Sequence, residues 1–421
     1  VQPPDGNHLE ESGGDGGMKW EKVKLGDVCE ITSSKRIFYS EYVDDGVPFY
    51  RSKEIIESDE GKIIENPLYI SVDKYNEIKE KFGVPQTGDM LLTSVGTIGI
   101  PYIIKKKDCF YFKDGNLTWF RDFREDLNSK YLYYWIKSSE GTGTLYNTTI
   151  GSSQKALTIS ALKNIKVSLP PRSVQDKIVE VVSVYDDLIE NNQKQIKLLE
   201  EAAQRLYKEW FVDLRFPGHE NTKIVDGIPE GWSVYPFSSK VDIMSGGTPK
   251  TSIPDYYNGK IPFYTPKDSD GAFFAYKTQM NITEGGLKNC NSRLYPPKTV
   301  IITARGTVGK TTILAVPMAM NQSCYALKMK ENDAPYYLFF TLNNEIKALQ
   351  TMANGGVFNT IIGKTFDSIN IQIPKDPLIY GFEETVRPFM EQIKNKLQAN
   401  SKLIEARNRL LPKMMSGEVE V

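Results

Sequence analysis

The amino-acid sequence contains an internal repeat, and this repeat constrains the fold more than any other feature. Short motifs recur in the same order in the two halves of the chain, about 205–214 residues apart. The separation drifts, so loop lengths differ between the copies while the order of elements is kept. The clearest pairs are Gly46–Tyr50 with Lys260–Tyr264, Asp89–Gly99 with Lys298–Gly309, and Asn164–Pro170 with Ser368–Pro374. The repeat predicts two divergent copies of one unit, each a globular domain followed by a helix.

Within each copy, short apolar runs separated by Gly, Pro, Asn and Asp predict an α+β domain. We expect strands at Met90–Thr93 and Val300–Thr303. Each leads into a Gly-Thr-x-Gly turn, and the chain returns in a second strand. The predicted returning strands are Pro101–Lys105 and Thr311–Val316, and the predicted helices, rich in Tyr, Phe and Leu, are Asn128–Ser139 and Ala334–Leu349.

The segment after each globular part has apolar residues at spacings of three and four, the pattern of a coiled-coil seam. Polar residues interrupt the seam at Asn192, Asn400 and Arg407. A helix of about 35 residues is roughly 50 Å long, which exceeds the width of one domain. Pairing of the two helices is therefore favoured over packing of each on its own domain. The predicted seam residues are Val174, Ile178, Val181, Tyr185, Leu188, Ile196, Leu199, Ala202, Leu206 and Trp210, and Phe382, Val386, Phe389, Ile393, Leu397, Leu403, Leu410 and Met414.

Composition and charge exclude several classes of protein. No apolar run in the 421 residues approaches the ~18–20 needed to span a membrane. The four cysteines lie far apart and only two histidines occur, which argues against a disulfide framework or a His-metal site. We interpret residues 1–17 as tag or processing residue. Without them the formal net charge changes from −1 to about +3, whereas a stand-alone DNA-binding protein is usually strongly basic.

One motif imitates a nucleotide-binding loop. Ala304–Thr311 fits a relaxed phosphate-loop pattern and follows a predicted strand. A true phosphate loop opens a helix, but here a β-branched run follows and ends at Pro317. We therefore predict a hairpin tip with exposed Arg305 and Lys310. Since neither copy shows a paired-carboxylate or nuclease-like cluster, we predict that the chain is not catalytic.

Three small polar or basic loops recur in each copy and are the candidate binding loops. Ser, Thr and Lys side chains can hold phosphates, while Arg, Lys and Asp can read base edges. One loop lies near the start of each unit, one follows the Pro-Phe-Tyr strand, and one is the Gly-Thr-x-Gly tip. The candidate DNA-binding residues are Ser33, Ser34, Lys35, Arg36, Arg51, Lys53, Ser94 and Thr97 in the first copy, and Gly246, Gly247, Thr248, Lys250, Thr265, Lys267, Asp268, Arg305, Thr307 and Lys310 in the second.

Four stretches of the sequence resemble the specificity subunit of type I restriction-modification enzymes. One stretch is in the globular part of the second copy and one is in the first long helix. The other two are the most specific, and they lie at the end of the first long helix and at the C-terminus. The first copy departs from the family's pattern, since it has Ser33–Arg36 where the second has Gly246–Pro249. The stretches are Ser245–Pro249 with Gly259–Asp268, Leu169–Pro171 with Gln175–Ile178 and Asp186–Asn192, Leu206–Pro217, and Leu410–Glu418.

The resemblance implies a fold of two tandem α+β target recognition domains joined by two long antiparallel helices, with pseudo-twofold symmetry. It also implies a DNA specificity subunit that binds double-stranded DNA with a split target and docks two adenine-methyltransferase (modification) subunits. S-adenosylmethionine would be bound by those partners, with no cofactor in this chain. Two restriction subunits, which would use ATP and Mg, could join the complex in the cytoplasm of a bacterium or archaeon. The implied domains are 18–172 (recognition domain 1), 173–216 (helix 1, the spacer), 217–375 (recognition domain 2) and 376–421 (helix 2 and tail).

Two alternative functions remain from the residues alone. One is a P-loop NTPase-type regulator with a coiled-coil arm, based on Ala304–Thr311. The other is a scaffold that holds proteins with its helix pair and does not contact DNA.

Overall fold

The computed structural model describes residues 20–61, 64, 66–151, 155–352 and 360–419, without the side chains of 347–352. The interpretation of residues 1–17 therefore falls outside the described residues. The chain forms two compact units: the first comprises Val1–Asn191 with Asn400–Val421, and the second comprises Asn192–Ala399. The fold is mixed α+β, as predicted. No described helix is both long and apolar enough to cross a membrane.

Among its described residues, the first unit contains three small sheets. The main sheet is antiparallel with strand order β2-β9-β6-β7, the second has order β3-β5-β4-β8, and β1 pairs with β10. The predicted strands around the first Gly-Thr-x-Gly turn are confirmed as β6 and a slightly shorter β7. The strands are β1 Glu21–Lys24, β2 Glu30–Thr32, β3 Tyr42–Val43, β4 Val47–Tyr50, β5 Leu68–Ile70, β6 Met90–Thr93, β7 Pro101–Ile103, β8 Tyr111–Phe112, β9 Leu117–Arg121 and β10 Lys166–Leu169.

The second unit repeats this topology. Its main sheet has order β14-β21-β18-β19-β16, so the first four strands match β2-β9-β6-β7 and β16 is an addition. The order β17-β15-β20 matches β5-β4-β8, and β13 pairs with β22 as β1 pairs with β10. The strands are β11 Ile224–Val225, β12 Ile228–Pro229, β13 Ser233–Pro236, β14 Val241–Ser245, β15 Tyr257–Tyr264, β16 Phe274–Ala275, β17 Asn281–Ile282, β18 Val300–Thr303, β19 Thr311–Leu314, β20 Ala319–Met320, β21 Cys324–Met329 and β22 Asn370–Ile373.

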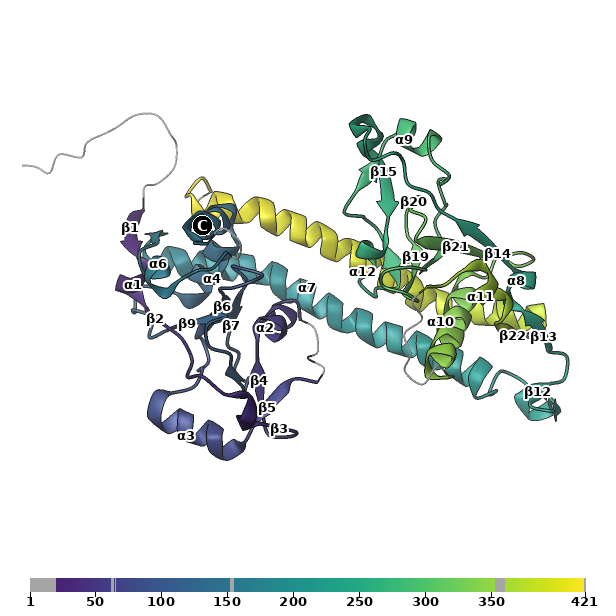
Figure 1. Cartoon of the computed structure of the whole chain (residues 1–421), viewed down its shortest axis with the longest axis horizontal. Coiled ribbons are helices and arrows are strands. Elements are labelled where there is room, and N and C mark those ends of the chain that lie inside the picture. Colours follow the sequence, from purple (N-terminus) through teal and green to yellow (C-terminus); the bar gives the residue numbers. More distant parts are fainter. Residues whose placement is uncertain (1–19, 62–63, 65, 152–154, 353–359, 420–421) are drawn as a thin grey trace, which may run out of the picture. The chain divides into compact units, whose positions relative to one another are not determined.

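Short helices lie between the strands, and two long helices follow the globular parts (Figure 1). The predicted helices at Asn128–Ser139 and Ala334–Leu349 are confirmed as α4 and α10. After α7 the chain continues in one π-helical turn, Lys208–Val212. The helices are α1 Leu25–Val28, α2 Ser52–Asp59, α3 Val72–Phe82, α4 Ser129–Lys137, α5 Ser139–Thr148, α6 Ile159–Lys163, α7 Arg172–Tyr207, α8 Phe237–Lys240, α9 Glu284–Lys288, α10 Pro335–Met352, α11 Gly363–Asp367 and α12 Asp376–Met415.

Helices α7 and α12 pack together as the predicted antiparallel pair, and each contributes to both units. In the first unit, Asp186 of α7 forms an ion pair with Arg407 of α12. In the second unit, Tyr207 of α7 contacts Phe382 of α12, with ring centroids 5.9 Å apart. Residue numbers therefore rise along one helix as they fall along the other.

The predicted seam of α7 is wrong in detail. The structure buries Val182, Ile189 and Ala203, whereas their neighbours Val181, Leu188 and Ala202 are exposed. The buried residues Ile178, Val182, Ile189, Ile196 and Ala203 belong to a coiled-coil seam in which the spacing alternates between four and three residues. The positions between them, 185, 192 and 199, are partly buried. Each misassigned residue is the first of two adjacent apolar residues, and spacing alone does not distinguish the two.

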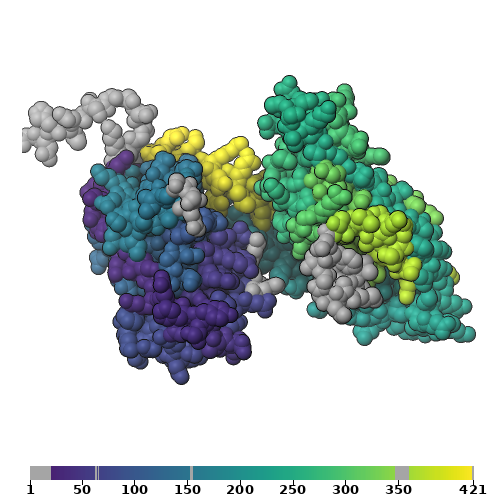
Figure 2. Space-filling view, viewed as in Figure 1, coloured from purple at the N-terminus to yellow at the C-terminus, as the bar shows by residue number. Residues whose placement is uncertain are grey.

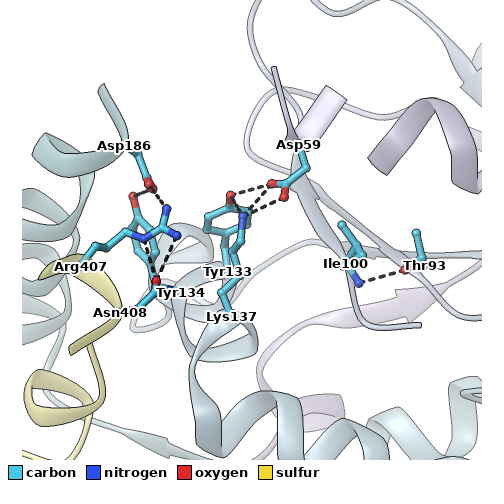
Figure 3. Close-up of polar contacts among 9 residues, drawn as sticks. All are labelled: Asp59, Thr93, Ile100, Tyr133, Tyr134, Lys137, Asp186, Arg407 and Asn408. Carbon is cyan, nitrogen blue, oxygen red and sulfur yellow. Dashed lines mark hydrogen bonds and ion pairs between the residues drawn. The ribbon is translucent and has the colours of Figure 1, made fainter. Parts of the chain in front are cut away.

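Polar side chains fix the register of the long helices. Asn400 is buried, and its amide donates to the Ile189 carbonyl oxygen, with 3.4 Å between Nδ2 and O. Arg407 and the hydroxyl of Tyr134 on α4 both bind the Asp186 carboxylate, at 2.8 Å for the hydroxyl (Figure 3). The polar breaks predicted at Asn400 and Arg407 are thus seam positions with specific partners.

The long helices also hold the N-terminal ends of α4 and α10, with different residue types. Gln175 of α7 is fully buried, and its carbonyl oxygen accepts from the Asn128 N–H at 2.9 Å. Glu383 of α12 is 3% exposed and accepts from the Tyr337 N–H at 2.8 Å. Burial raises the pKa of Glu383 to about 7, because the charged form is poorly solvated there.

Candidate nucleic-acid interface

Sheet topology brings two of the predicted loops of each unit to one edge. Strands β2 and β6 both pair antiparallel with β9, so they run in the same direction, and Thr32 and Leu91 both lie opposite Trp119. Strands β14 and β18 have the same relation to β21 in the second unit. In each unit, the loop that follows β2 or β14 and the Gly-Thr-x-Gly tip therefore leave the sheet at the same end of the strands.

The two Gly-Thr-x-Gly tips have the same internal geometry. Thr93 Oγ1 accepts from the Ile100 N–H at 2.9 Å (Figure 3), and Thr303 Oγ1 accepts from the Lys310 N–H at 3.0 Å. The glycines of both tips, Gly96, Gly99, Gly306 and Gly309, have φ between +78° and +85°, which L side chains rarely adopt. A buried threonine hydroxyl thus closes each tip, and the glycines make the turn possible.

The second tip is not a phosphate-binding loop. Gly309-Lys310 leads into strand β19 rather than a helix, which confirms the predicted strand–turn–strand and contradicts the NTPase alternative. The Lys310 side chain is exposed and lines a cavity of about 710 Å³ in the second unit, together with Arg205 of α7 and Asn343 of α10. Lys310 is therefore available to an anionic group outside the tip.

The residues after the Pro-Phe-Tyr strands are tied into local structure. The prediction of a loop at Arg51–Lys53 is wrong, since α2 begins at Ser52. Glu54 accepts from the Arg51 N–H and from its guanidinium; burial acts to raise the pKa of Glu54, but these hydrogen bonds outweigh it and the pKa is lowered. Asp268 accepts from the Thr265 N–H and hydroxyl and from the Gln279 N–H, at 2.7–2.8 Å. Arg51 and Asp268 thus have structural roles beside any contact with a ligand.

A fourth element, missed in the sequence, joins the three loops. In the first unit this connecting turn is Lys113–Asn116, between β8 and β9. The Lys113 N–H donates to the carbonyl oxygen of Tyr50, the Asn116 carbonyl accepts from the Ser94 N–H, and Asp114 forms an ion pair with Arg36. The turn therefore contacts two of the predicted loops and the end of β4, which precedes Arg51. Its Asp-Gly dipeptide is a turn signal that could have identified it.

The second unit has the same arrangement at Asn321–Ser323, its connecting turn. The Asn321 N–H donates to the Tyr264 carbonyl oxygen, and the Ser323 carbonyl accepts from the Ala304 N–H. Gln322 binds the Thr248 hydroxyl. We call the three loops and the connecting turn of each unit its loop cluster.

The predicted residues differ in how accessible they are. Ser34, Ser94, Gly246 and Gly247 are buried, and the Ser94 hydroxyl bonds that of Thr118 at 2.7 Å. Ser33, Arg51, Thr265 and Asp268 are partly buried. The exposed set, which alone offers full side chains to a partner, is Lys35, Arg36, Lys53, Thr97, Thr248, Lys250, Lys267, Arg305, Thr307 and Lys310.

Charge pairing differs between the clusters. In the first, Arg36, Arg51 and Lys53 form ion pairs with Asp114, Glu54 and Glu57, at 2.8, 2.6 and 3.7 Å. In the second, no carboxylate among the described residues pairs with a cation of the loop cluster; these cations are Lys250, Lys267, Arg305 and Lys310.

Comparison with known proteins identifies the family. The model of the type I restriction modification DNA specificity domain matches the chain twice, at residues 18–201 and 229–401. The MjaIX specificity subunit of Methanocaldococcus jannaschii, a type I restriction enzyme component, is 28% identical over 96% of this chain and 94% of its own length. The HindI specificity subunit of Haemophilus influenzae is 24% identical over 62% of this chain and 71% of its own.

A solved structure shows the same fold. The S subunit of a type I restriction-modification system from M. genitalium superposes with a TM-score of 0.57 over 95% of this chain and 97% of that one, at 16% identity. Since two copies of the specificity domain account for both halves of the chain, the scaffold alternative without DNA is also wrong. The chain belongs to the type I restriction-modification DNA specificity family and is the non-catalytic specificity subunit of such a complex.

Proposed function

We propose that each unit recognises one half of a split target in double-stranded DNA through its loop cluster. The observation that carries this proposal is that, in both units, the segments after β2 or β14, at the end of β4 or β15 and at the Gly-Thr-x-Gly tip meet at a connecting turn. Exposed threonines and cations of these clusters are suited to phosphate oxygens and base edges. Two half-sites read separately would explain why the family's domain occurs twice in one chain.

We also propose that two modification subunits bind the chain and bring S-adenosylmethionine for adenine methylation. Restriction subunits with ATP and Mg would join the same complex. The nearly neutral charge supports dependence on partners, since a binder that acts alone needs more basic surface to neutralise phosphates.

An apolar strip on α7 supports docking of a partner. In the first unit, Val181, Val184 and Leu188 are 36%, 53% and 46% exposed and recur at spacings of three and four, so they lie along one side of the helix. Adjacent exposed apolar residues on one helix face are typical of a surface that another helix covers.

The proposal is tested by mapping methylated adenines. Cells that carry the modification subunit with or without this chain are compared by genome-wide methylation sequencing. We expect one split motif that is methylated only when the chain is present. A methylated motif that does not depend on the chain would contradict the proposal.

Docking is tested separately by co-purification. Replacement of Val184 and Leu188 by Asp should abolish recovery of the modification subunit with the chain. The control is Val72→Asp, because Val72 is also an exposed valine of the first unit, at 55%, but begins α3. Equal recovery with all variants would contradict a role for α7.

A further inference from the structure

The first unit contains a polar cavity of about 320 Å³ beside its loop cluster. It lies between the loop that follows β2, the C-terminal end of α3, and strands β8 and β9. Helix α3 lies at the surface of this unit (Figure 1, Figure 2). The cavity is near the lower end of the range of about 300–1,000 Å³ found for ligand sites.

All the charged side chains that line this cavity are cations. They are Lys35, Lys81 and Arg121. Lys35 Nζ lies 4.4 Å from the centre of the Phe82 ring, and the Arg121 guanidinium lies 4.6 Å from the Trp119 ring. The aromatic faces hold both cations in place without neutralising them.

The carboxylates that pair with two of these cations stay outside the lining. Arg121 binds Glu30 at 2.8 Å and lies 3.6 Å from the exposed Asp122, and Lys81 binds Glu77 at 3.0 Å. Both glutamates are nearly half exposed, at 44% and 47% of the side chain. Because such exposed pairs contribute little free energy, an anion inside the cavity can compete for the same cations.

One hydroxyl group beside the cavity points to a missing ligand. Ser33 Oγ and Ser34 Oγ are shielded from solvent and have no hydrogen-bond partner of good geometry among the described residues. The Ser34 hydroxyl also interacts with the Tyr111 phenol and acts to lower the pKa of that tyrosine, so Ser33 alone is treated as unpartnered. A shielded hydroxyl without a partner is unfavourable, and an anion that accepts its hydrogen bond removes the cost.

We propose that this cavity holds one phosphate of the DNA backbone. This inference rests on the proposed function, in which the first unit binds the DNA of one half-site. Three cations and the Ser33 hydroxyl suit a phosphodiester, which has only acceptor oxygens and one negative charge. Lys35 adjoins Arg36, whose partner Asp114 belongs to the connecting turn, so the cavity is continuous with the loop cluster.

The corresponding place in the second unit is closely packed. There the backbone of Gly246 and Gly247 packs against neighbouring segments, and a Cβ on either would lie 2.2 Å from the Asn321 carbonyl oxygen or 2.7 Å from the Asn291 nitrogen. We therefore place the phosphate site in the first unit, where the strand register sets Ser34 and Lys35 at the positions of Gly246 and Gly247.

The test measures the salt dependence of DNA binding by the full chain with its modification subunits. Lys35→Ala and Lys81→Ala are compared with Lys79→Ala, because Lys79 is an exposed lysine of α3 outside the cavity. Each cavity variant should weaken binding about three- to tenfold on target and unrelated duplexes alike. The double variant should lower the slope of log K against log salt by about one, the value for one phosphate. A double variant that behaves like Lys79→Ala would overturn the proposal.

The hydroxyl is tested by Ser33→Ala. We expect weaker DNA binding by about tenfold with an unchanged or higher melting temperature of the free chain, since the hydroxyl lacks a partner there. A lower melting temperature with unchanged DNA affinity would mean a structural role and would overturn the assignment.

Two further arms separate the sources of phosphate and the two proposals. Inorganic phosphate could stabilise the wild type but not the double variant, while the two proteins bind DNA with equal affinity. In that case the cavity binds a free anion, and the proposal that it holds a DNA phosphate is wrong. If the wild type does not distinguish the target from the unrelated duplex, the proposed half-site recognition fails. The unrelated duplex still tests the cavity, because phosphate contacts do not depend on sequence.

Discussion

The two units share one topology but distribute their charge differently. In the first, the cations of the loop cluster are mostly held by carboxylates, and the polar cavity adds two more cations, Lys81 and Arg121. In the second, Arg305 and Lys310 project from the hairpin tip without an ion pair among the described residues. A duplicated fold therefore does not imply a duplicated interface, since loop residues change without altering the sheets.

The largest expected effect comes from exchanging a whole unit. Each unit has its own loop cluster, so replacement of residues 18–168 by the same segment of a relative should change one half-site completely and leave the other intact. Methylation sequencing of cells with the chimera gives both half-sites. If both changed together, the units would not read DNA independently.

The next effect concerns the capping residues Gln175 and Glu383. Glu383 titrates at about 7 when folded and at 4.5 when unfolded, so unfolding releases its proton between these pH values. Its contribution to stability is therefore largest below pH 4.5 and falls by about 3 kcal/mol as pH rises to about 7. Gln175 is neutral and should give no such change.

Glu383→Gln isolates this effect. The amide oxygen can still accept from the Tyr337 N–H, so the variant should match wild type near pH 4.5 and be more stable at pH 8. Urea unfolding at several pH values measures the difference. A constant difference between the two proteins across this range would show that Glu383 is ionised in the folded chain.

A smaller effect is expected where the second unit needs glycine. Gly246→Ala places a methyl group against the Asn321 carbonyl oxygen and should reduce the free energy of unfolding by about 2 kcal/mol. Gly363→Ala is the control, because open space surrounds that position. Thermal unfolding that fails to separate the two variants would contradict the close packing.

The smallest effect concerns single cations of the loop clusters. Lys310→Ala should weaken DNA binding by about 1 kcal/mol or less if it meets a phosphate. Lys53→Ala should have a still smaller effect, because Lys53 already lies 3.7 Å from Glu57. Fluorescence anisotropy with a labelled duplex measures both. A larger loss for Lys53→Ala would reverse the proposed difference between the units.

Elements with a strong local signal were predictable from sequence. The Gly-Thr-x-Gly tips were placed correctly, because the left-handed backbone at Gly96 and Gly306 restricts the residue type. The same reasoning recognised the strand after Lys310. Arg51 was misplaced because the start of α2 depends on Glu54, whose capping role has no distinct sequence pattern.

The sequence by itself determined the repeat, the α+β class and the pairing of two long helices, because each follows from the order and spacing of residue types. Only the tertiary structure decided which of Val181 and Val182 is buried, since that depends on the partner helix and not on spacing. It also decided that Ser33 lines a cationic cavity with Arg121. Residues so far apart in the chain meet only when strands pair, so no local pattern records their contact.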